Sequence, residues 1–256
     1  MIKIVFFDID GTLIPFDTGE LPASTKDSLD ALRKNGIYTV LATGKSLSQL
    51  RKMKVMEAEF DGFITLNGQL IYDSDMNVYA GTPIDDGEME ILAGIFKANR
   101  IPFLLLGEKT RYINYLNDLV IEKQLGTNAT IPRVGNYAGE KIYQITAFVD
   151  GHQRELLENV LDLCTVTAWD ENGIDIIAKG GGKRHAIEQV LSSGNFERSE
   201  TMAFGDAEND IKMLEFVGTG VAMGNATDPV KSIADYITTD IHDDGIKNAL
   251  MHFGLI

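Results

Sequence analysis

Two acidic segments carry the side chains best suited to chemistry in this sequence. The first, Asp8-Ile9-Asp10-Gly11-Thr12, directly follows the apolar run Ile4–Phe7, which predicts a strand buried on both faces. Asp8 and Asp10 are two residues apart, so their side chains point the same way on an extended backbone. Two carboxylates this close repel each other unless a cation neutralises them, which indicates a hard divalent ion such as Mg²⁺. The alternative is an Asp-rich turn that only closes the strand.

The second acidic segment lies near the other end of the chain. The apolar run Met202–Phe204 leads into Gly205-Asp206-Ala207-Glu208-Asn209-Asp210, again at the predicted end of a buried strand. Asp206 and Asp210 offer further oxygen ligands, although acids here also suit the first turn of a helix. Because ligands bind at the carboxyl ends of parallel strands, one shared metal site explains both segments.

Two further segments are candidates for holding a phosphate group. Thr43-Gly44 follows the apolar run Tyr38–Ala42, and its hydroxyl and backbone N–H groups suit phosphate oxygens, with an ordinary helix N-cap as the alternative. Lys183 follows three glycines and opens a predicted helix, so its side chain can reach back over the strand ends. There it would offset carboxylate repulsion and stabilise charge on a phosphoryl group. The alternatives are a solvated Lys183, or Lys179 as the phosphate lysine.

Alternating strands and helices must position these segments. The first 80 residues, like those after Lys183, alternate apolar runs with helical patterns, which is typical of a parallel sheet with helical crossovers. Asn67-Gly68 predicts a type I′ hairpin. Between these parts, the pattern mixes helices with runs of strands. The sequence therefore predicts an α/β protein with a Rossmann-like parallel-sheet core, residues 1–81 and 180–256, and an inserted α+β domain, residues 82–179.

Composition excludes several classes of protein. The chain has 256 residues, with 23 Lys and Arg against 38 Asp and Glu, so its formal net charge is −15. This balance argues against nucleic-acid binding and against adsorption to anionic membranes. Cys164, the single cysteine, excludes an internal disulfide and fits a reducing compartment. The first apolar run is too short for a signal peptide, and no stretch approaches a membrane span, so we expect a cytoplasmic protein of unassigned oligomeric state.

Two residues of the insert have less specific patterns. Cys164 ends a stretch with helical periodicity and is expected to be a small core residue. Trp169 either packs in the core or lines a substrate pocket.

Together, the chemically suited segments resemble the four ordered motifs of the haloacid dehalogenase superfamily, in the order Asp8-x-Asp10-Gly11-Thr12, Thr43-Gly44, Lys183 and Gly205-Asp206-x-x-Asn209-Asp210. The resemblance covers nearly the whole chain. The Cof-type sugar-phosphatase branch, with its large α/β cap, is similar in its long insert and in Asn67-Gly68, Gly224-Asn225-Ala226 and Asp244-Gly245.

This resemblance implies a role for each candidate residue. Asp8 would be the nucleophile that forms an aspartyl-phosphate, and Asp10 the general acid and base. Mg²⁺ would be held by the Asp8 carboxylate, the Asp10 backbone carbonyl and Asp206, with Asp210 in support. The phosphoryl oxygens would be held by Ile9, Thr43, Gly44, Lys183 and Asn209. Residues 82–179 would be a cap that closes over the leaving group and excludes water.

The expected activity is Mg²⁺-dependent hydrolysis of phosphate monoesters of small metabolites, above all sugar phosphates. A phosphomutase is one alternative. A non-enzymatic phospho-receiver is the other, although such modules are much shorter than this chain. Two positions depart from the family pattern: Lys45 stands where this branch usually has Arg, and Arg184-His185 follows Lys183 where a Gly is common.

Overall fold

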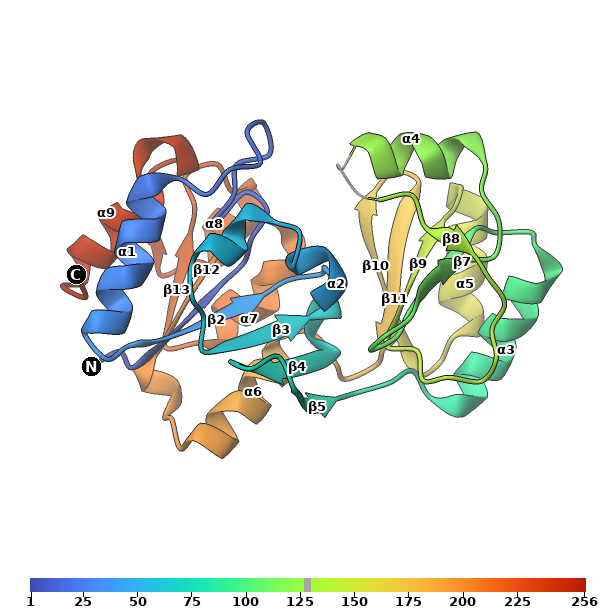
Figure 1. Cartoon of the computed structure of the whole chain (residues 1–256), viewed down its shortest axis with the longest axis horizontal. Helices are drawn as coiled ribbons and strands as arrows, with labels where there is room; N and C mark the ends of the chain where they lie inside the picture. Colours follow the sequence, from blue (N-terminus) through green and yellow to red (C-terminus); the bar gives the residue numbers. More distant parts are fainter. Residues whose placement is uncertain (127–129) are drawn as a thin grey trace. The chain divides into compact units, whose positions relative to one another are not determined.

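The computed structural model describes residues 1–126 and 130–256, which form two compact units (Figure 1). Unit 1 consists of Met1–Ala80 with Gly182–Ile256, and unit 2 of Gly81–Gly181. Unit 2 therefore starts one residue before the expected insert and ends two residues after it. Among the described residues, no helix combines the length and the apolar character that crossing a membrane requires.

Unit 1 contains one eight-stranded sheet. Its strands are β1 (Ile4–Phe7), β2 (Tyr38–Ala42), β3 (Gly62–Thr65), β4 (Leu70–Asp73), β5 (Val78–Gly81), β12 (Thr201–Gly205), β13 (Thr219–Ala222) and β14 (Tyr236–Ile237). Its α-helices are α1 (Ala23–Lys34), α2 (Leu47–Leu50), α6 (Lys183–Gly194), α7 (Ile211–Phe216), α8 (Asp228–Ile233) and α9 (Gly245–His252).

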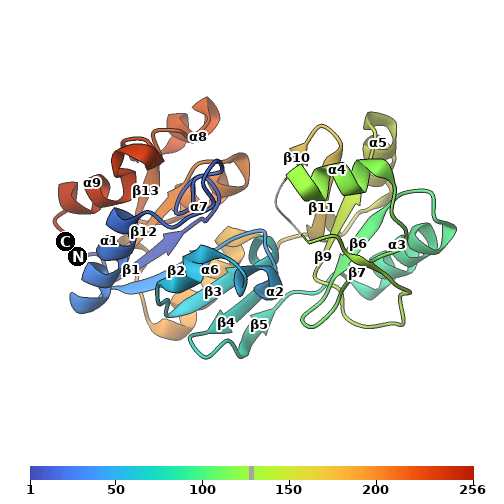
Figure 2. The same cartoon turned by 45° about the horizontal axis from the view of Figure 1, so that its top comes forward.

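The sheet order is β14-β13-β12-β1-β2-β3-β4-β5, and the six strands from β14 to β3 are parallel. Helices lie on both faces of this sheet, as the turned view in Figure 2 shows. The α/β class with a parallel-sheet core is therefore confirmed. Strands β1 and β12 are buried along their whole length. Both faces of each strand are therefore covered, which explains why apolar residues do not alternate with polar ones along them.

The centre of the sheet brings the predicted site segments together. Phe7 on β1 pairs with Phe204 on β12 and with Leu41 on β2, and the Phe7 and Phe204 rings stack with centroids 5.2 Å apart. Because these three strands are parallel and in register, the residues that follow them emerge at one edge of the sheet.

The hairpin between β3 and β4 differs from the predicted type I′ turn. β3 and β4 pair antiparallel as expected, but Thr65 pairs with Leu70, so four residues form the connection instead of two. Leu66–Gly68 forms a 3₁₀ turn in which Leu66, Asn67 and Gly68 all have positive φ. The dipeptide signal located the turn correctly, and the longer connection places Asn67 beside the site described below.

The described residues of unit 2 form a six-stranded sheet and three helices. The strands are β6 (Phe103–Leu106), β7 (Arg111–Ile113), β8 (Arg133–Val134), β9 (Gln144–Phe148), β10 (Cys164–Asp170) and β11 (Gly173–Ala178), and the helices are α3 (Asp86–Ala98), α4 (Asp118–Gly126) and α5 (Gly151–Val160). The sheet order is β10-β11-β9-β6-β7-β8, antiparallel except between β7 and β8.

The two faces of this sheet have different roles. Alternate strand residues such as Phe103, Ile145 and Ile176 pack with Leu92 of α3 and Leu157 of α5 in one apolar core. The residues between them point to the opposite face. This alternation divides unit 2 into a packed core and a second, more polar face.

Cys164 lies in the core of unit 2 but begins strand β10, so the predicted helical environment is wrong. Helix α5 ends at Val160, before this position. Burial and the neighbouring Glu88 carboxylate raise the pKa of the Cys164 thiol to about 12, which keeps it protonated and unreactive.

Candidate active site

Three buried carboxylates meet at the carboxyl ends of β1 and β12. Asp8 directly follows β1, Asp206 directly follows β12, and Asp210 ends the 3₁₀ turn Glu208–Asp210. Each offers a carboxylate oxygen, and these oxygens all lie within 4.8 Å of one another. The two acidic segments therefore share one site, although Asp8 and Asp206 are far apart in the sequence.

Lys183 completes this cluster from the first position of α6. Its Nζ lies 2.5 Å from Asp8 Oδ1 and 2.6 Å from Asp210 Oδ1, and its side chain is 1% exposed. The alternative interpretation of Lys183 as a solvated lysine is therefore wrong. Lys179, the competing candidate, donates to the Asp162 carbonyl in unit 2 instead.

The cluster has an excess of negative charge. When ionised, the three carboxylates carry three negative charges against one positive charge on Lys183. Burial is the main cause that raises the pKa of Asp8 well above its ordinary value. The Lys183 ammonium lowers it, and the Asp210 and Asp206 carboxylates raise it again. Burial of Lys183 acts to lower its pKa, but Asp210 and Asp8 together raise it, so the ammonium stays charged.

The pKa of Asp206 is also raised by burial and by a neighbouring carboxylate. Burial, followed by the Asp210 carboxylate, raises the pKa of Asp206 to about 7, although Thr12 donates a hydrogen bond to Oδ1 at 2.8 Å. Carboxylates that repel one another in a buried site are the oxygen donors that a hard divalent cation prefers. The side chains of Asp8, Asp206 and Asp210 therefore fit a site for such a cation.

Asp10 lies apart from these three carboxylates. Its Oδ2 forms an ion pair with Lys45 Nζ at 2.7 Å, and its side chain is 34% exposed. Its carboxylate is thus oriented by a cation and remains accessible to solvent. Any contribution of Asp10 to a metal would have to come from its backbone carbonyl, which stays a prediction.

The loop after Asp8 is held close to Asp206 and to a distant segment. Gly11 has a φ of +81°, and a Cβ there would collide with the Asp206 carboxylate. The Gly11 carbonyl accepts from Asn225 Nδ2 at 2.7 Å, and Asn225 Oδ1 accepts from the Ile241 N–H. Asn225 belongs to the segments that carry the family resemblance. Only the structure shows that its side chain connects Gly11 to Ile241.

Ile9 has a fully buried side chain, so only its backbone could contact a phosphate. Its carbonyl accepts from the N–H groups of Leu13 and Ile14, at 2.9 and 2.8 Å. These bonds fold the loop back on itself directly after Asp8.

The phosphate candidates at the ends of β2 and β12 lie together around Asn67. A Cβ on Gly44 would lie 3.0 Å from Asn67 Oδ1, and Asn209 Nδ2 lies 3.5 Å from the same oxygen. Thr43 is buried, and its carbonyl accepts from the Asn67 N–H. Thr43, Gly44 and Asn209 therefore form one polar group with Asn67, a residue whose sequence signal indicated only a turn.

Gly68 determines how α6 enters the site. A Cβ on Gly68 would collide with the backbone of Gly182, and would lie 2.7 Å from the Lys183 nitrogen. This close approach of two backbones places the start of α6 against the β3–β4 turn. We found no local signal for this contact, because it joins residues more than 100 positions apart.

Comparison with known proteins agrees with this geometry. The profile of the haloacid dehalogenase-like hydrolase family matches residues 5–250. The putative phosphatase YkrA of Bacillus subtilis is 31% identical over 257 residues, covering 99% of this chain and 98% of that protein. The Bacillus subtilis enzyme YcsE, a 5-amino-6-(5-phospho-D-ribitylamino)uracil phosphatase, is 29% identical and covers 99% of this chain and 96% of its own.

Solved structures show the same likeness. The structure of BT1666, from a study of haloalkanoate-superfamily phosphatases in Bacteroides thetaiotaomicron, has a TM-score of 0.91 at 29% identity, covering 100% of this chain and 96% of that one. The subclass IIB sugar phosphatase BT4131 has a TM-score of 0.88 at 30% identity, covering 99% and 100%.

The fold and the site thus define a hydrolase with an acidic centre at the carboxyl edge of a parallel sheet. This chain belongs to the haloacid dehalogenase-like hydrolase family. It is an enzyme of the phosphatase type, as the predicted resemblance implied.

Proposed function

We propose that this enzyme hydrolyses phosphate monoesters of small cytoplasmic metabolites, with sugar phosphates as the main class, through an aspartyl-phosphate on Asp8. The observation that carries the proposal is the buried contact of Asp8 with Lys183, beside Asp206 and Asp210. Phosphoryl transfer depends mainly on positioning and on stabilisation of charge, and this cluster offers both. The similarity to a sugar phosphatase and to a phosphatase of a ribityl compound supports a polyhydroxylated leaving group.

In the first step, an Asp8 carboxylate oxygen attacks phosphorus as the ester P–O bond breaks. Asp10 donates a proton to the leaving oxygen, since its carboxyl group is accessible and oriented by Lys45. Lys183 holds a phosphoryl oxygen and balances its charge. The polar group of Thr43, Gly44 and Asn209 binds the remaining oxygens.

In the second step, a water attacks phosphorus and the bond between phosphorus and Asp8 breaks. Asp10 now accepts the proton of that water, and inorganic phosphate leaves with the Asp8 carboxylate restored. Mg²⁺, held by Asp8, Asp206 and Asp210, would supply positive charge beside the transferred group.

We propose unit 2 as the specificity domain, corresponding to the cap of the family.

Phosphate release from a panel of sugar phosphates, p-nitrophenyl phosphate and acetyl phosphate, with Mg²⁺ and with a chelator, tests this function. We expect Mg²⁺-dependent release, greatest with sugar phosphates. A phosphomutase would convert a sugar phosphate into its isomer without releasing phosphate. No turnover of any ester in the presence of Mg²⁺ would contradict the proposal.

Lys45→Ala is expected to lower kcat by about 10- to 100-fold, because Asp10 loses the cation that orients its carboxylate. Lys45→Arg should retain most activity, since a guanidinium can hold the same oxygen. The exposed Lys52, on the same segment, provides the control variant Lys52→Ala. Steady-state kinetics on one sugar phosphate measure all three, and an unchanged kcat in Lys45→Ala would contradict this role.

Mg²⁺ is expected to raise the unfolding midpoint more at pH 8 than at pH 5.5. The pKa of Asp206 is about 7 in the folded protein and about 4 in an unfolded chain. Between these values the folded state retains a proton that the unfolded state has lost, so the stability of the metal-free protein falls as the pH rises from about 4 to about 7. Metal binding requires the ionised carboxylate, so its stabilising effect grows over the same range.

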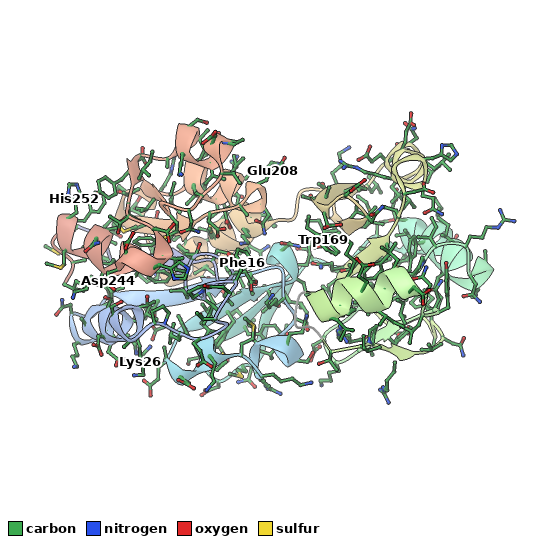
Figure 3. The ribbon with its side chains drawn as sticks, turned by 90° about the horizontal axis from the view of Figure 1, so that it is seen from above. Phe16, Lys26, Trp169, Glu208, Asp244 and His252 are labelled. Carbon is green, nitrogen blue, oxygen red and sulfur yellow. The ribbon has the colours of Figure 1, made fainter. Side chains whose placement is uncertain are left out.

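Asp206→Asn separates the effect of the buried charge on the metal-free protein from the stabilisation by Mg²⁺. It should remove most of the stabilisation by Mg²⁺ and raise the midpoint of the metal-free protein at pH 8 by about 3 to 6 °C, because one buried charge is gone. Glu208→Gln, at an exposed acid of the same segment (Figure 3), should behave like the wild type. Thermal unfolding with Mg²⁺ and with a chelator measures the difference. An equal Mg²⁺ effect in Asp206→Asn and the wild type would exclude Asp206 as a ligand.

A further inference from the structure

Arg184 follows Lys183 in the first turn of α6 and packs against the neighbouring helix α7. Its guanidinium carbon lies 5.2 Å from the centre of the Phe216 ring, at the end of α7. Its Nε donates to Glu188 Oε1, one turn along α6, at 3.0 Å. The side chain is 57% exposed, so these contacts orient it more than burial does. Arg184 stands where the family pattern commonly has Gly, so the motif itself assigns it no role.

Helix α7 is fixed to the acidic centre by the residue that precedes it. Asp210 comes directly before α7 and is fully buried. Its Oδ1 accepts from Lys183 Nζ at 2.6 Å. Its Oδ2 accepts from the N–H groups of Asp206 and Ala207, at 3.1 and 3.2 Å. The start of α7 therefore has a defined position relative to the carboxylates of the site.

Two separate contacts thus join the first turn of α6 to α7. Lys183 contacts Asp210 at the start of α7, and Arg184 contacts Phe216 at its end. A helix of this length spans about 9 Å, at a rise of 1.5 Å per residue. Two contacts at that separation resist rotation of the α6 start about either one of them.

The chain before α6 restrains Lys183 only weakly. Of the three glycines that precede it, Gly180 and Gly182 have φ values of +82° and +108°. Because glycine has the largest conformational freedom of all residues, this segment does not by itself fix the direction of the helix. The backbone of Gly68 limits the start of α6 on one side, and Arg184 holds it on the side of α7.

We infer that Arg184 is a positioning residue, which packs on Phe216 and thereby keeps the Lys183 ammonium beside Asp8. The inference rests on the proposed function, since Lys183 is the residue that would hold a phosphoryl oxygen. Arg184 acts through its neighbour and contacts no reacting atom. A charge that stabilises a transition state must be placed accurately, so a small displacement of Lys183 lowers the rate of phosphoryl transfer.

Arg198 provides a matched control within the same cluster. Its guanidinium carbon lies 5.5 Å from the centre of the same Phe216 ring. It belongs to the 3₁₀ turn Arg198–Glu200 before β12, and its Nη2 donates to the Glu215 carbonyl at 3.0 Å. Arg198 therefore makes the same kind of contact with α7 without being next to Lys183 in the chain.

Steady-state kinetics and thermal unfolding of Arg184→Ala and Arg198→Ala test the inference. Both variants should lower the unfolding midpoint by about 1 to 3 °C, because each removes one cation from the ring. Only Arg184→Ala should lower kcat on the best phosphate ester, by about five- to tenfold. Arg184→Lys should recover most of that loss, since an ammonium also packs over an aromatic ring. An unchanged kcat in Arg184→Ala, or an equal loss in Arg198→Ala, would overturn the inference.

Phe216→Leu distinguishes positioning from a direct effect of the Arg184 charge. It removes the ring and leaves the charge, so it should lower kcat about as much as Arg184→Ala. The double variant Arg184→Ala/Phe216→Leu should be no slower than either single variant, because both changes remove the same contact. Phe216→Tyr keeps an aromatic ring and should match the wild type. A kcat that falls in Arg184→Ala but not in Phe216→Leu would indicate a charge effect and contradict the inference.

The proposed function and the positioning role fail in different ways. If the wild type releases phosphate from no ester, the proposed function is wrong and the inference falls with it. If the wild type is active and Lys183→Ala loses activity while Arg184→Ala does not, the proposed function stands and the positioning role of Arg184 is wrong.

Discussion

Asp8→Asn is expected to reduce phosphate release by about 10⁴-fold or more, the largest effect of any single substitution in this chain. The amide cannot attack phosphorus, so the covalent step is lost while the shape of the residue is kept. Folding should be retained, because the change removes a charge that burial and the neighbouring acids disfavour. Rates are measured with Mg²⁺ on the best sugar phosphate, and the unfolding midpoint is measured on the same samples.

A second measurement ties this loss to the aspartyl-phosphate. Acid quenching of the wild type during turnover of labelled substrate should trap label on the protein, and Asp8→Asn should trap none. Asp27→Asn, at an exposed acid of α1, is the control and should match the wild type in both assays. An Asp8→Asn enzyme that keeps more than about one hundredth of the activity would be incompatible with a nucleophilic Asp8.

Lys183→Ala is expected to lower kcat by about 10³-fold, which is the second largest effect. The substitution removes the ammonium that balances Asp8 and Asp210 and that would stabilise the transferred phosphoryl group. It should also destabilise the metal-free protein by about 3 to 5 kcal/mol, since two buried carboxylates lose their partner. Mg²⁺ should restore part of this stability, because a bound cation neutralises the same carboxylates.

The matched control is Lys179→Ala, four residues earlier, whose Nζ bonds only the Asp162 carbonyl among the contacts that the structure describes. It should change kcat less than about twofold. Lys183→Met keeps most of the side-chain volume, so its kcat reports the loss of charge separately from any cavity. A larger loss in Lys179→Ala than in Lys183→Ala would reverse the assignment of the phosphate lysine. Urea unfolding and steady-state kinetics measure both variants.

Local patterns were most reliable where a buried strand runs into a polar segment. β1 is found at the predicted Ile4–Phe7, and β12 covers the predicted apolar run before Asp206. Such runs are readable because a central parallel strand must be apolar on both faces. Helix α4 and the true length of the β3–β4 connection were missed, because both depend on packing within each unit more than on local propensity.

Local sequence patterns did not predict the contacts between residues that are distant in the sequence. Lys45 was noted only as a departure from an arginine, and its ion pair with Asp10 appears once β1 and β2 lie side by side. Asn67 and Gly68 indicated a turn, whereas in the fold they lie against Asn209 and Gly182.

Read alone, this sequence determined where its strands end and which acids follow them, because an apolar run that ends in a polar segment is a local property of the chain. It therefore predicted the α/β class and, through the resemblance, the family and the phosphatase type. Only the tertiary structure decided that Lys183 is buried between Asp8 and Asp210, and that Trp169 is held over Gly173 beside Phe148. These contacts depend on strand register and on the close approach of two backbones. Both arise from packing between segments that are distant in the sequence, so no local pattern predicts them.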